Sequence, residues 1–384
     1  MTAEAVARPS SGTRVAALDG LRGLVILSVV VNHAGGVLWP RGEAYDVPVL
    51  RGLLGGGAVV VFFVVGAFIV ARGLLRDRER ATLDPMRFYL RRIVRLGAQL
   101  VLVCAAVWVA AHFDPTDEVS DRVMAHNVFH VLSYTFNIFG ERDFFEVQRE
   151  FGHLWYLSVQ QQCYLVLPLV IVLLGRVRWA LFGLLVMLVG LVFWWRQEVL
   201  DDRGWVIASS LTSTRADGLI WGVAVAVALP WLHRVRVWPR ILWVSCLVLV
   251  TLKLVLPELP TFAYLGPWSL AFTAVAGVVV VAIWQLEQPT RVSRMLSWRP
   301  LQVMGKASLA IFVWHLPVII IVQRHTADWS WPARTALAFA VIAAITVVVE
   351  RWVDDPIRHL LATRPVFRLG RPTSPGVPLP ESTP

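Results

Sequence analysis

The amino-acid sequence predicts an all-α, polytopic membrane protein with about ten transmembrane helices. Of its 384 residues, 57% are hydrophobic and 16% are charged, whereas an ordinary soluble domain has about 25% charged residues. Apolar segments recur from residue 18 to residue 352, and each is near the ~20 residues that cross a bilayer as a helix. Arginines gather in the polar links between these segments, as they do in cytoplasmic loops of membrane proteins.

One membrane domain over residues 18–358 accounts for this pattern. We expect a cytoplasmic segment before it (1–17) and a disordered, Pro-rich cytoplasmic tail after it (359–384), with no fused extracytoplasmic domain. The first apolar run lacks a small-residue cleavage pattern, so we predict that it stays in the mature protein. The ten predicted spans lie at residues 18–39, 53–72, 93–112, 154–174, 177–195, 213–232, 238–256, 262–285, 303–323 and 332–352.

Loop charge predicts the orientation of these spans, because cytoplasmic loops retain arginine and lysine. Residues 72–95 carry eight arginines, whereas residues 114–150 are rich in Asp and Glu. The first link is therefore predicted to lie inside the cell and the second outside, which places both termini in the cytoplasm. Arginines at the later inner links agree with this assignment: Arg176, Arg178, Arg234, Arg236, Arg240, Arg291, Arg294 and Arg299. The net charge of +10 is thus loop charge, and we expect no nucleic-acid partner.

The stretch 123–139 is half apolar and contains His126, Asn127, His130 and Asn137. We predict an outward-facing or re-entrant helix here, since irregular backbone inside a membrane needs protein cover. An eleventh span at this point would invert the orientation of everything downstream.

Two ionisable residues stand inside the first predicted span, where each costs a few kcal/mol in lipid. Arg22 and His33 lie about 16 Å apart along a helix axis and on nearly the same face. Imidazole exchanges protons near neutral pH, and a guanidinium group binds phosphate. The pair suggests an anionic ligand that enters from inside. The alternative is a snorkelling arginine and a histidine that hydrogen-bonds to a neighbouring helix.

Further polar residues are predicted near the same depths. Arg92 and Arg95 share one helical face at the start of the third span and suit phosphate, although loop charge alone also explains them. On the outer side, the side chains predicted to converge near His33 are His153, Ser158, Gln161, Arg215, Asp217 and His315. Hydrogen-bonded structural histidines and a structural ion pair are the alternatives.

Metal and disulfide chemistry receives no support from the sequence. Cys104, Cys163 and Cys246 sit in apolar runs without CxxC spacing or paired histidines. The sequence also lacks an HExxH motif, a Gly-rich phosphate loop and an Asp-rich cluster at a helix start. We therefore expect no metal and no permanently bound cofactor.

A series of short segments resembles the acyltransferase type 3 family of membrane O-acyltransferases. Leu18-Asp19-Gly-Leu-Arg22-Gly, followed by His33, is similar to the first-helix signature of that family. Each further segment is a weak match, but the ordered set covers nearly the whole chain and is highly specific. These segments lie at residues 62–69, 88–95, 153–159, 214–222, 305–308, 314–317 and 350–356.

The resemblance implies a ten-helix domain that transfers an acyl group, typically acetyl, from cytoplasmic acyl-CoA to a hydroxyl of a sugar, glycolipid, polysaccharide or secondary metabolite. It implies that Arg22 and His33 are essential and that Arg92 and Arg95 join Arg22 in holding the CoA phosphates. Asp19 belongs to the same signature as a supporting residue. His33 is then expected to act as general base on the acceptor, with an acyl-histidine intermediate as the variant.

One departure from the family pattern bears on activity. Gln160 and Gln161 stand where the family usually has glutamates, and glutamine neither holds a charge nor accepts a proton at neutral pH. We therefore expect Asp217 to orient His33 instead, and a catalytically inactive protein is the alternative. A secondary transporter is the alternative from another class, but the sequence lacks its two related halves with Gly/Pro-broken helices. Within the enzyme interpretation, an external envelope glycan and an internal glycosylated metabolite compete as acceptor.

Overall fold

The computed structural model describes residues 11–40, 52, 56–117, 119–142, 146–232, 238–256 and 264–364. All regular structure within these ranges is helical and none of it is strand, which confirms the predicted all-α class. The first ten residues, Arg234, Arg236 and the tail from residue 365 lie outside the described ranges.

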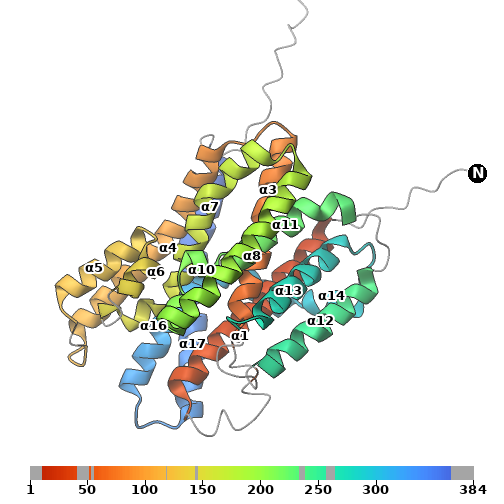
Figure 1. The fold of residues 1–384 in the computed structure, drawn as a ribbon. Helices are drawn as coiled ribbons and strands as arrows, with labels where there is room; N and C mark the ends of the chain where they lie inside the picture. The colour runs from red at the N-terminus through yellow and green to blue at the C-terminus, as the bar shows by residue number, and fades with distance from the viewer. Residues whose placement is uncertain are drawn as a thin grey trace, which may run out of the picture.

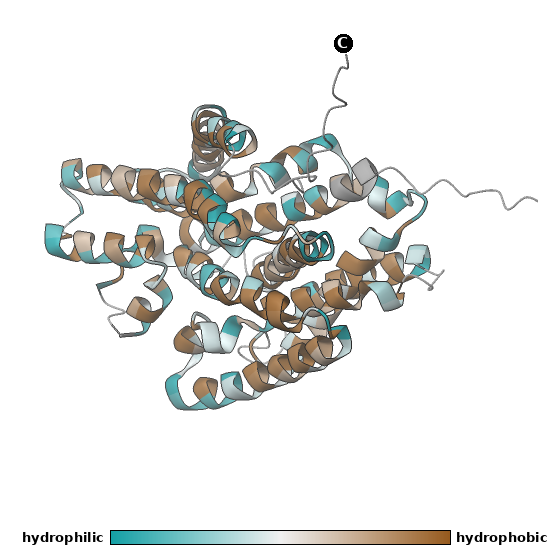
Figure 2. Ribbon diagram, turned by 90° about the horizontal axis from the view of Figure 1, so that it is seen from above, coloured by the Kyte–Doolittle hydropathy of each residue, from teal (hydrophilic) through white to brown (hydrophobic). Residues whose placement is uncertain are grey.

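Nine helices among the described residues are long and apolar enough to cross a membrane, and all nine coincide with predicted spans. They are α1 (Ser11–Leu38), α3 (Ala58–Glu79), α4 (Pro85–Phe113), α7 (Trp155–Leu174), α8 (Arg178–Arg203), α12 (Trp238–Val255), α13 (Trp268–Gln285), α16 (Ser308–His325) and α17 (Trp331–Val349). Figure 1 shows them gathered side by side. In Figure 2 the helices are largely hydrophobic, and hydrophilic residues concentrate near their ends. The chain is a multi-pass membrane protein.

The remaining predicted span, at residues 213–232, is a shorter helix, α11 (Asp217–Leu232), with 16 residues. A lipid-exposed helix of this length falls just short of the roughly 17 residues that cross a bilayer. Most of α11 is buried against other helices instead. A Cβ atom on Gly222 would lie 2.4 Å from the carbonyl oxygen of Val64, so the glycine lets α11 and α3 meet backbone to backbone. Protein cover therefore replaces part of the lipid contact of this helix.

Short helices complete the described fold. They are α5 (Asp121–Leu132), α6 (Phe136–Arg142), η2 (Arg149–Leu154), α9 (Trp205–Ala208), α10 (Thr212–Arg215), α14 (Arg291–Leu296), α15 (Arg299–Lys306), η4 (Glu350–Asp354) and α18 (Asp355–Thr363). Helices α5 and α6 cover most of residues 123–139, where an eleventh span would have inverted the predicted orientation. Each is far too short to cross a bilayer, so the expectation of a non-spanning helix there is confirmed, while its facing side stays a prediction.

Helix α4 begins eight residues before the predicted span because its first turn is capped. The Asp84 side chain accepts a hydrogen bond from the backbone N–H of Arg87 at 3.1 Å, and Pro85 occupies the first helical position. Arg91, Arg92 and Arg95 therefore project from a helix rather than from a loop.

Glycines bring α1 into direct backbone contact with α14 and α15. A Cβ atom on Gly20 would lie 1.5 Å from the carbonyl oxygen of Leu296, and one on Gly305 would lie 1.8 Å from that of Asp19. No side chain fits at either position. Helix α1 carries both Arg22 and His33, so this contact determines where both side chains lie.

Four charged residues link the C-terminal ends of α4 and α16. The Arg324 guanidinium lies 2.8 Å from carboxylate oxygens of Asp114 and Glu150 and 2.9 Å from that of Asp117. Hydrogen bonds from Thr116 and from Arg324 hold the pKa of Asp114 below its usual range. The cluster anchors η2, the segment that carries His153, to the end of α16.

Gly305→Ala is predicted to destabilise the protein, because the added methyl group collides with the backbone of α1. We expect the free energy of unfolding to fall by about 1–3 kcal/mol, the usual cost of overpacking. Thermal unfolding in detergent, followed by the loss of monodisperse protein, measures the change. Gly183→Ala is the matched control, since a Cβ atom there meets nothing within 4 Å. Equal unfolding temperatures for the two variants would contradict the close contact.

Candidate functional site

A cavity of about 540 Å³ lies between α1, α3, α4, α7, α16 and α18. Its lining includes two aspartates, Asp77 and Asp84, and many apolar side chains. Its six arginines are Arg22, Arg76, Arg91, Arg92, Arg95 and Arg358. We call it the arginine cavity. An excess of positive charge beside apolar walls suits a ligand with several negative charges and an apolar arm.

Arg22 reaches this cavity from α1. Its Nη2 donates a hydrogen bond to Ser308 Oγ at 2.7 Å, at the start of α16. The nearest carboxylate oxygen, on Asp19, is 3.7 Å from Arg22 Nη1. This separation is longer than the ~2.7–2.9 Å of a charge-assisted hydrogen bond. Asp19 therefore compensates the charge of Arg22 only in part.

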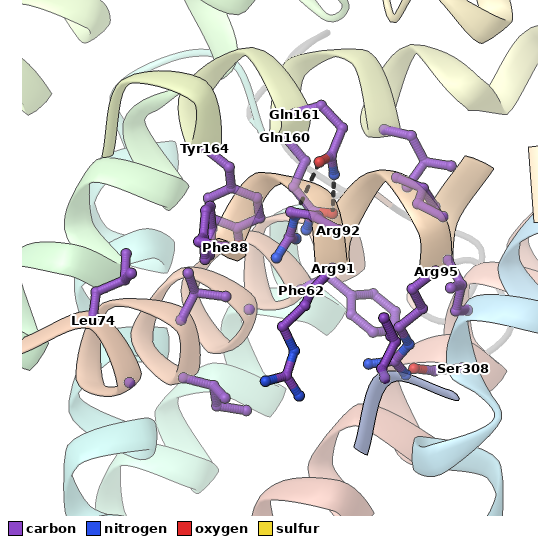
Figure 3. Close-up of a pocket in the computed structure, with 18 of the residues that line it drawn as sticks. Phe62, Leu74, Phe88, Arg91, Arg92, Arg95, Gln160, Gln161, Tyr164 and Ser308 are labelled. Carbon is purple, nitrogen blue, oxygen red and sulfur yellow. Dashed lines mark hydrogen bonds between the residues drawn. The ribbon is translucent and has the colours of Figure 1, made fainter. Parts of the chain in front are cut away.

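Arg92 and Arg95 stand on one face of α4 without a carboxylate partner among the described residues. Arg92 Nε donates to Gln161 Oε1 at 2.9 Å, and its guanidinium carbon lies 3.8 Å from the centre of the Tyr164 ring. Arg95 Nε is buried and has no hydrogen-bond partner. Figure 3 shows Arg92 beside Gln161 and Arg95 beside Ser308. The structure thus brings Arg22, Arg92 and Arg95 to one cavity and leaves much of their charge available to a ligand.

A second, smaller cavity of about 110 Å³ lies farther along α1. We call it the histidine cavity. Its lining comes from α1, the start of α3, the η2–α7 junction and α16. The lining residues are Val29, Asn32, His33, Gly56, Gly57, Ala58, Val59, His153, Trp155, Tyr156 and Phe312.

A hydrogen bond between two histidines determines which nitrogen of His33 carries the proton. His315 Nδ1 lies 2.7 Å from the carbonyl oxygen of Phe312, so it donates, and Nε2 of the neutral ring is left as an acceptor. His33 Nδ1 lies 3.0 Å from that Nε2 and 3.1 Å from the carbonyl oxygen of Val29, so it carries a proton. His33 Nε2 is then unprotonated and can accept a proton.

His153 brings a third imidazole to the group. Its Nε2 donates to the carbonyl oxygen of Val313 at 3.2 Å, while its Nδ1 is buried and has no hydrogen-bond partner in the part of the chain that the structure describes. The His153 and His315 ring centres lie 4.8 Å apart, and those of His33 and His315 lie 4.9 Å apart. The structure therefore brings together the three histidines that the sequence analysis expected to converge. His33 and His153 both line the cavity, and His315 lies behind them.

Asp217 has a different partner from the one expected. Its carboxylate accepts a hydrogen bond from Arg196 Nη1 at 2.8 Å, and both side chains are almost fully buried. Arg196 also donates to two backbone carbonyls and to Ser269 Oγ. Asp217 forms no hydrogen bond with His33, so the structure does not place it as the residue that orients His33. The carboxylate is instead paired with the buried guanidinium group of Arg196.

Arg215 and Ser158 line neither cavity. The Arg215 guanidinium carbon lies 5.8 Å from the centre of the Trp155 ring, so it packs behind a residue that does line the histidine cavity. Ser158 Oγ donates to the carbonyl oxygen of Leu154 at 3.5 Å, the residue directly before α7. The expected convergence with His33 therefore does not extend to these two side chains, nor to Gln161, which lines the arginine cavity.

Arg196 and the aromatic side chains between the cavities were not predicted from the sequence. A signal for Arg196 was present, because an arginine directly after the apolar run 177–195, at a predicted outer end, runs against the usual loop-charge pattern. Tyr156 and Phe312 line both cavities, yet each stands in an apolar run where aromatic residues are unremarkable. Only the packing of α7 against α16 distinguishes them.

A family model described as an acyltransferase domain matches residues 15–351. The peptidoglycan O-acetyltransferase OatA of Listeria monocytogenes is 27% identical over 376 residues, which cover 90% of this chain and 56% of that protein. The O-acetyltransferase OatA of Staphylococcus aureus is 24% identical over 360 residues, which cover 89% of this chain and 57% of that protein. The chain thus spans little more than half the length of these curated relatives. No solved structure matches it.

Asp217→Asn is predicted to destabilise the fold, because it leaves the buried Arg196 without a counter-charge. Breaking a buried ion pair from one side costs about 3–5 kcal/mol. Thermal unfolding in detergent tests this. Glu79→Gln is the control, since Glu79 pairs with Arg178 at a more exposed position, where pairs contribute about 0–1 kcal/mol. An Asp217→Asn protein as stable as this control would refute a structural role for the pair.

Proposed function

Because the chain belongs to the acyltransferase domain family, we propose that it is a membrane O-acyltransferase that moves a short acyl group from acyl-CoA to a sugar hydroxyl. The observation that carries this proposal is the pair of cavities along α1. One presents guanidinium groups to an anionic donor, and the other presents imidazole nitrogens to a hydroxyl. A single helix joins them through Arg22 and His33.

Acyl-CoA is the donor that matches the arginine cavity. Its phosphates would contact Arg22, Arg92 and Arg95, and its pantetheine arm would run along the apolar walls toward His33. Arg22 and His33 stand eleven positions apart on α1, about 16 Å along the axis, which is of the same order as the span of that arm. In the proposed orientation, the arginine cavity opens to the cytoplasm and the protein resides in the cytoplasmic membrane.

In the proposed reaction, His33 acts as general base. His33 Nε2 takes the proton of the acceptor hydroxyl while the hydroxyl oxygen attacks the thioester carbonyl carbon. The new C–O bond forms, the C–S bond breaks, and the CoA thiolate leaves toward the arginine cavity. The proton on His33 then passes to the thiolate or to solvent. The hydrogen bond to His315 keeps the proton of His33 on Nδ1 throughout, so Nε2 is the nitrogen that is left to act as the base.

The acceptor that we propose is an envelope sugar. The two relatives described above are named as O-acetyltransferases, and one of those names specifies peptidoglycan. The unpartnered Nδ1 of His153 offers a hydrogen-bond acceptor to a hydroxyl of such a sugar. Acetyl is the acyl group that these names support.

His33→Ala is predicted to slow acyl transfer strongly while acyl-CoA still binds, because the base is lost and the arginines remain. Transfer of radiolabelled acetyl from acetyl-CoA by purified protein in lipid, with peptidoglycan fragments and other envelope sugars as acceptors, measures this. General bases contribute about 10²–10⁴-fold to rate, so a loss of that size is expected.

The same assay separates the alternatives. A His33→Ala protein that retains the wild-type rate would remove His33 from the reaction. Binding of acetyl-CoA by the wild-type protein without transfer to any acceptor would favour a catalytically inactive relative. Label that stays on His33 in the absence of acceptor would replace direct attack by an acyl-histidine intermediate.

Arg92→Gln is predicted to weaken acetyl-CoA binding by roughly 10- to 100-fold, the loss of one hydrogen-bonded charge contact of about 1.5–3 kcal/mol. The dissociation constant from isothermal titration measures it. Arg176→Gln makes the same charge change at a residue outside the cavity and should bind as the wild type does. If both variants bind equally well, Arg92 does not contact the donor.

A further inference from the structure

Two aromatic side chains separate the arginine cavity from the histidine cavity. Tyr156 on α7 and Phe312 on α16 are the two residues that line both cavities, and their ring centres lie 5.0 Å apart. Both residues are 6% exposed. We call this pair the aromatic partition. The two rings therefore stand where the arginine cavity and the histidine cavity meet.

The partition is held in place from both cavities. The Tyr156 ring stacks on Phe63 of α3, with ring centres 4.4 Å apart and planes at 15°, and its hydroxyl accepts a hydrogen bond from Gln160 Nε2 at 3.2 Å. The Phe312 ring centre lies 5.1 Å from that of His153. Contacts with α3, with η2 and within α7 keep the two rings close together, so a passage between the cavities would run past both rings.

The two cavities also differ greatly in size. The arginine cavity measures about 540 Å³ and the histidine cavity about 110 Å³. In the reaction, the smaller space has to hold the acyl group and the tip of the acceptor together. Each additional methylene of the acyl group therefore competes with the acceptor for space, or has to remain in the passage between the rings.

Building on the proposed function, we propose that Tyr156 and Phe312 determine which acyl groups the enzyme transfers. The aromatic partition lets an acetyl group reach His33 and holds back longer acyl chains, although their CoA portion binds equally well at the arginines. The partition also limits the entry of water from the arginine cavity. Water that attacks the thioester carbon forms a C–O bond, breaks the C–S bond, and yields a free carboxylic acid and CoA.

The test compares acetyl-, butyryl- and hexanoyl-CoA as donors for the wild-type protein and for Phe312→Leu and Phe312→Ala. Transfer to the acceptor and total CoA release are measured in parallel. Phe68→Leu is the matched control, because Phe68 is a fully buried phenylalanine of α3 that lines neither cavity. Phe312→Leu serves as the milder variant should the alanine protein not fold.

We expect the wild-type protein to favour acetyl over hexanoyl by at least about tenfold, since single methylenes in a confined pocket change rates by that order. Phe312→Leu and Phe312→Ala should reduce this preference about tenfold and raise the ratio of CoA release to transfer, while Phe68→Leu keeps both values. An unchanged preference in both folded Phe312 variants would overturn the partition proposal, as would a wild-type protein that transfers hexanoyl as fast as acetyl. Absence of transfer from every donor would instead overturn the proposed function.

Discussion

The close backbone contact of α1 with α14 and α15 is the constraint on which the site depends. Glycines remove the side chains that would separate these helices, so α1 has one well-defined position. Arg22 and His33 both project from α1, and the rigid rise of the helix sets their separation. The proposed donor site and the proposed proton acceptor are thus held at a constant distance by one element, and the other helices supply their surroundings.

Compensation of charge distinguishes Arg196 from the arginines of the proposed donor site. Arg196 is fully buried, and Asp217, Ser269 and backbone carbonyls satisfy its hydrogen-bond donors. Among the residues that the structure describes, Arg92 and Arg95 lack such a carboxylate, and Gln161 gives Arg92 only a neutral oxygen. An uncompensated charge at this depth is unfavourable unless a bound ligand supplies the opposite charge. The two kinds of arginine look alike in the sequence, and only their partners separate them.

Hydropathy predicted the transmembrane helices well because the length of an apolar run is a local property of the chain. The early start of α4 depended on a cap at Asp84, a signal that a window average does not register. The pairing of Asp217 with Arg196 joins α11 to α8, and the roles of Tyr156 and Phe312 arise from packing between α7 and α16. Such contacts between distant segments leave no local pattern. The gathering of His33, His153 and His315 was foreseeable because imidazoles in apolar runs need polar neighbours.

The charge of the arginine cavity also affects what happens after transfer. CoA keeps all its phosphates when it loses the acyl group, so contacts with Arg22, Arg92 and Arg95 would hold product as firmly as substrate. Binding energy of this kind lowers the substrate concentration that the enzyme needs but does not speed the chemical step. In the proposed reaction, free CoA is therefore a competitive inhibitor, and the rate of envelope modification follows the cellular ratio of acyl-CoA to CoA. The cavity would thereby couple the cell surface to the metabolic state of the cytoplasm.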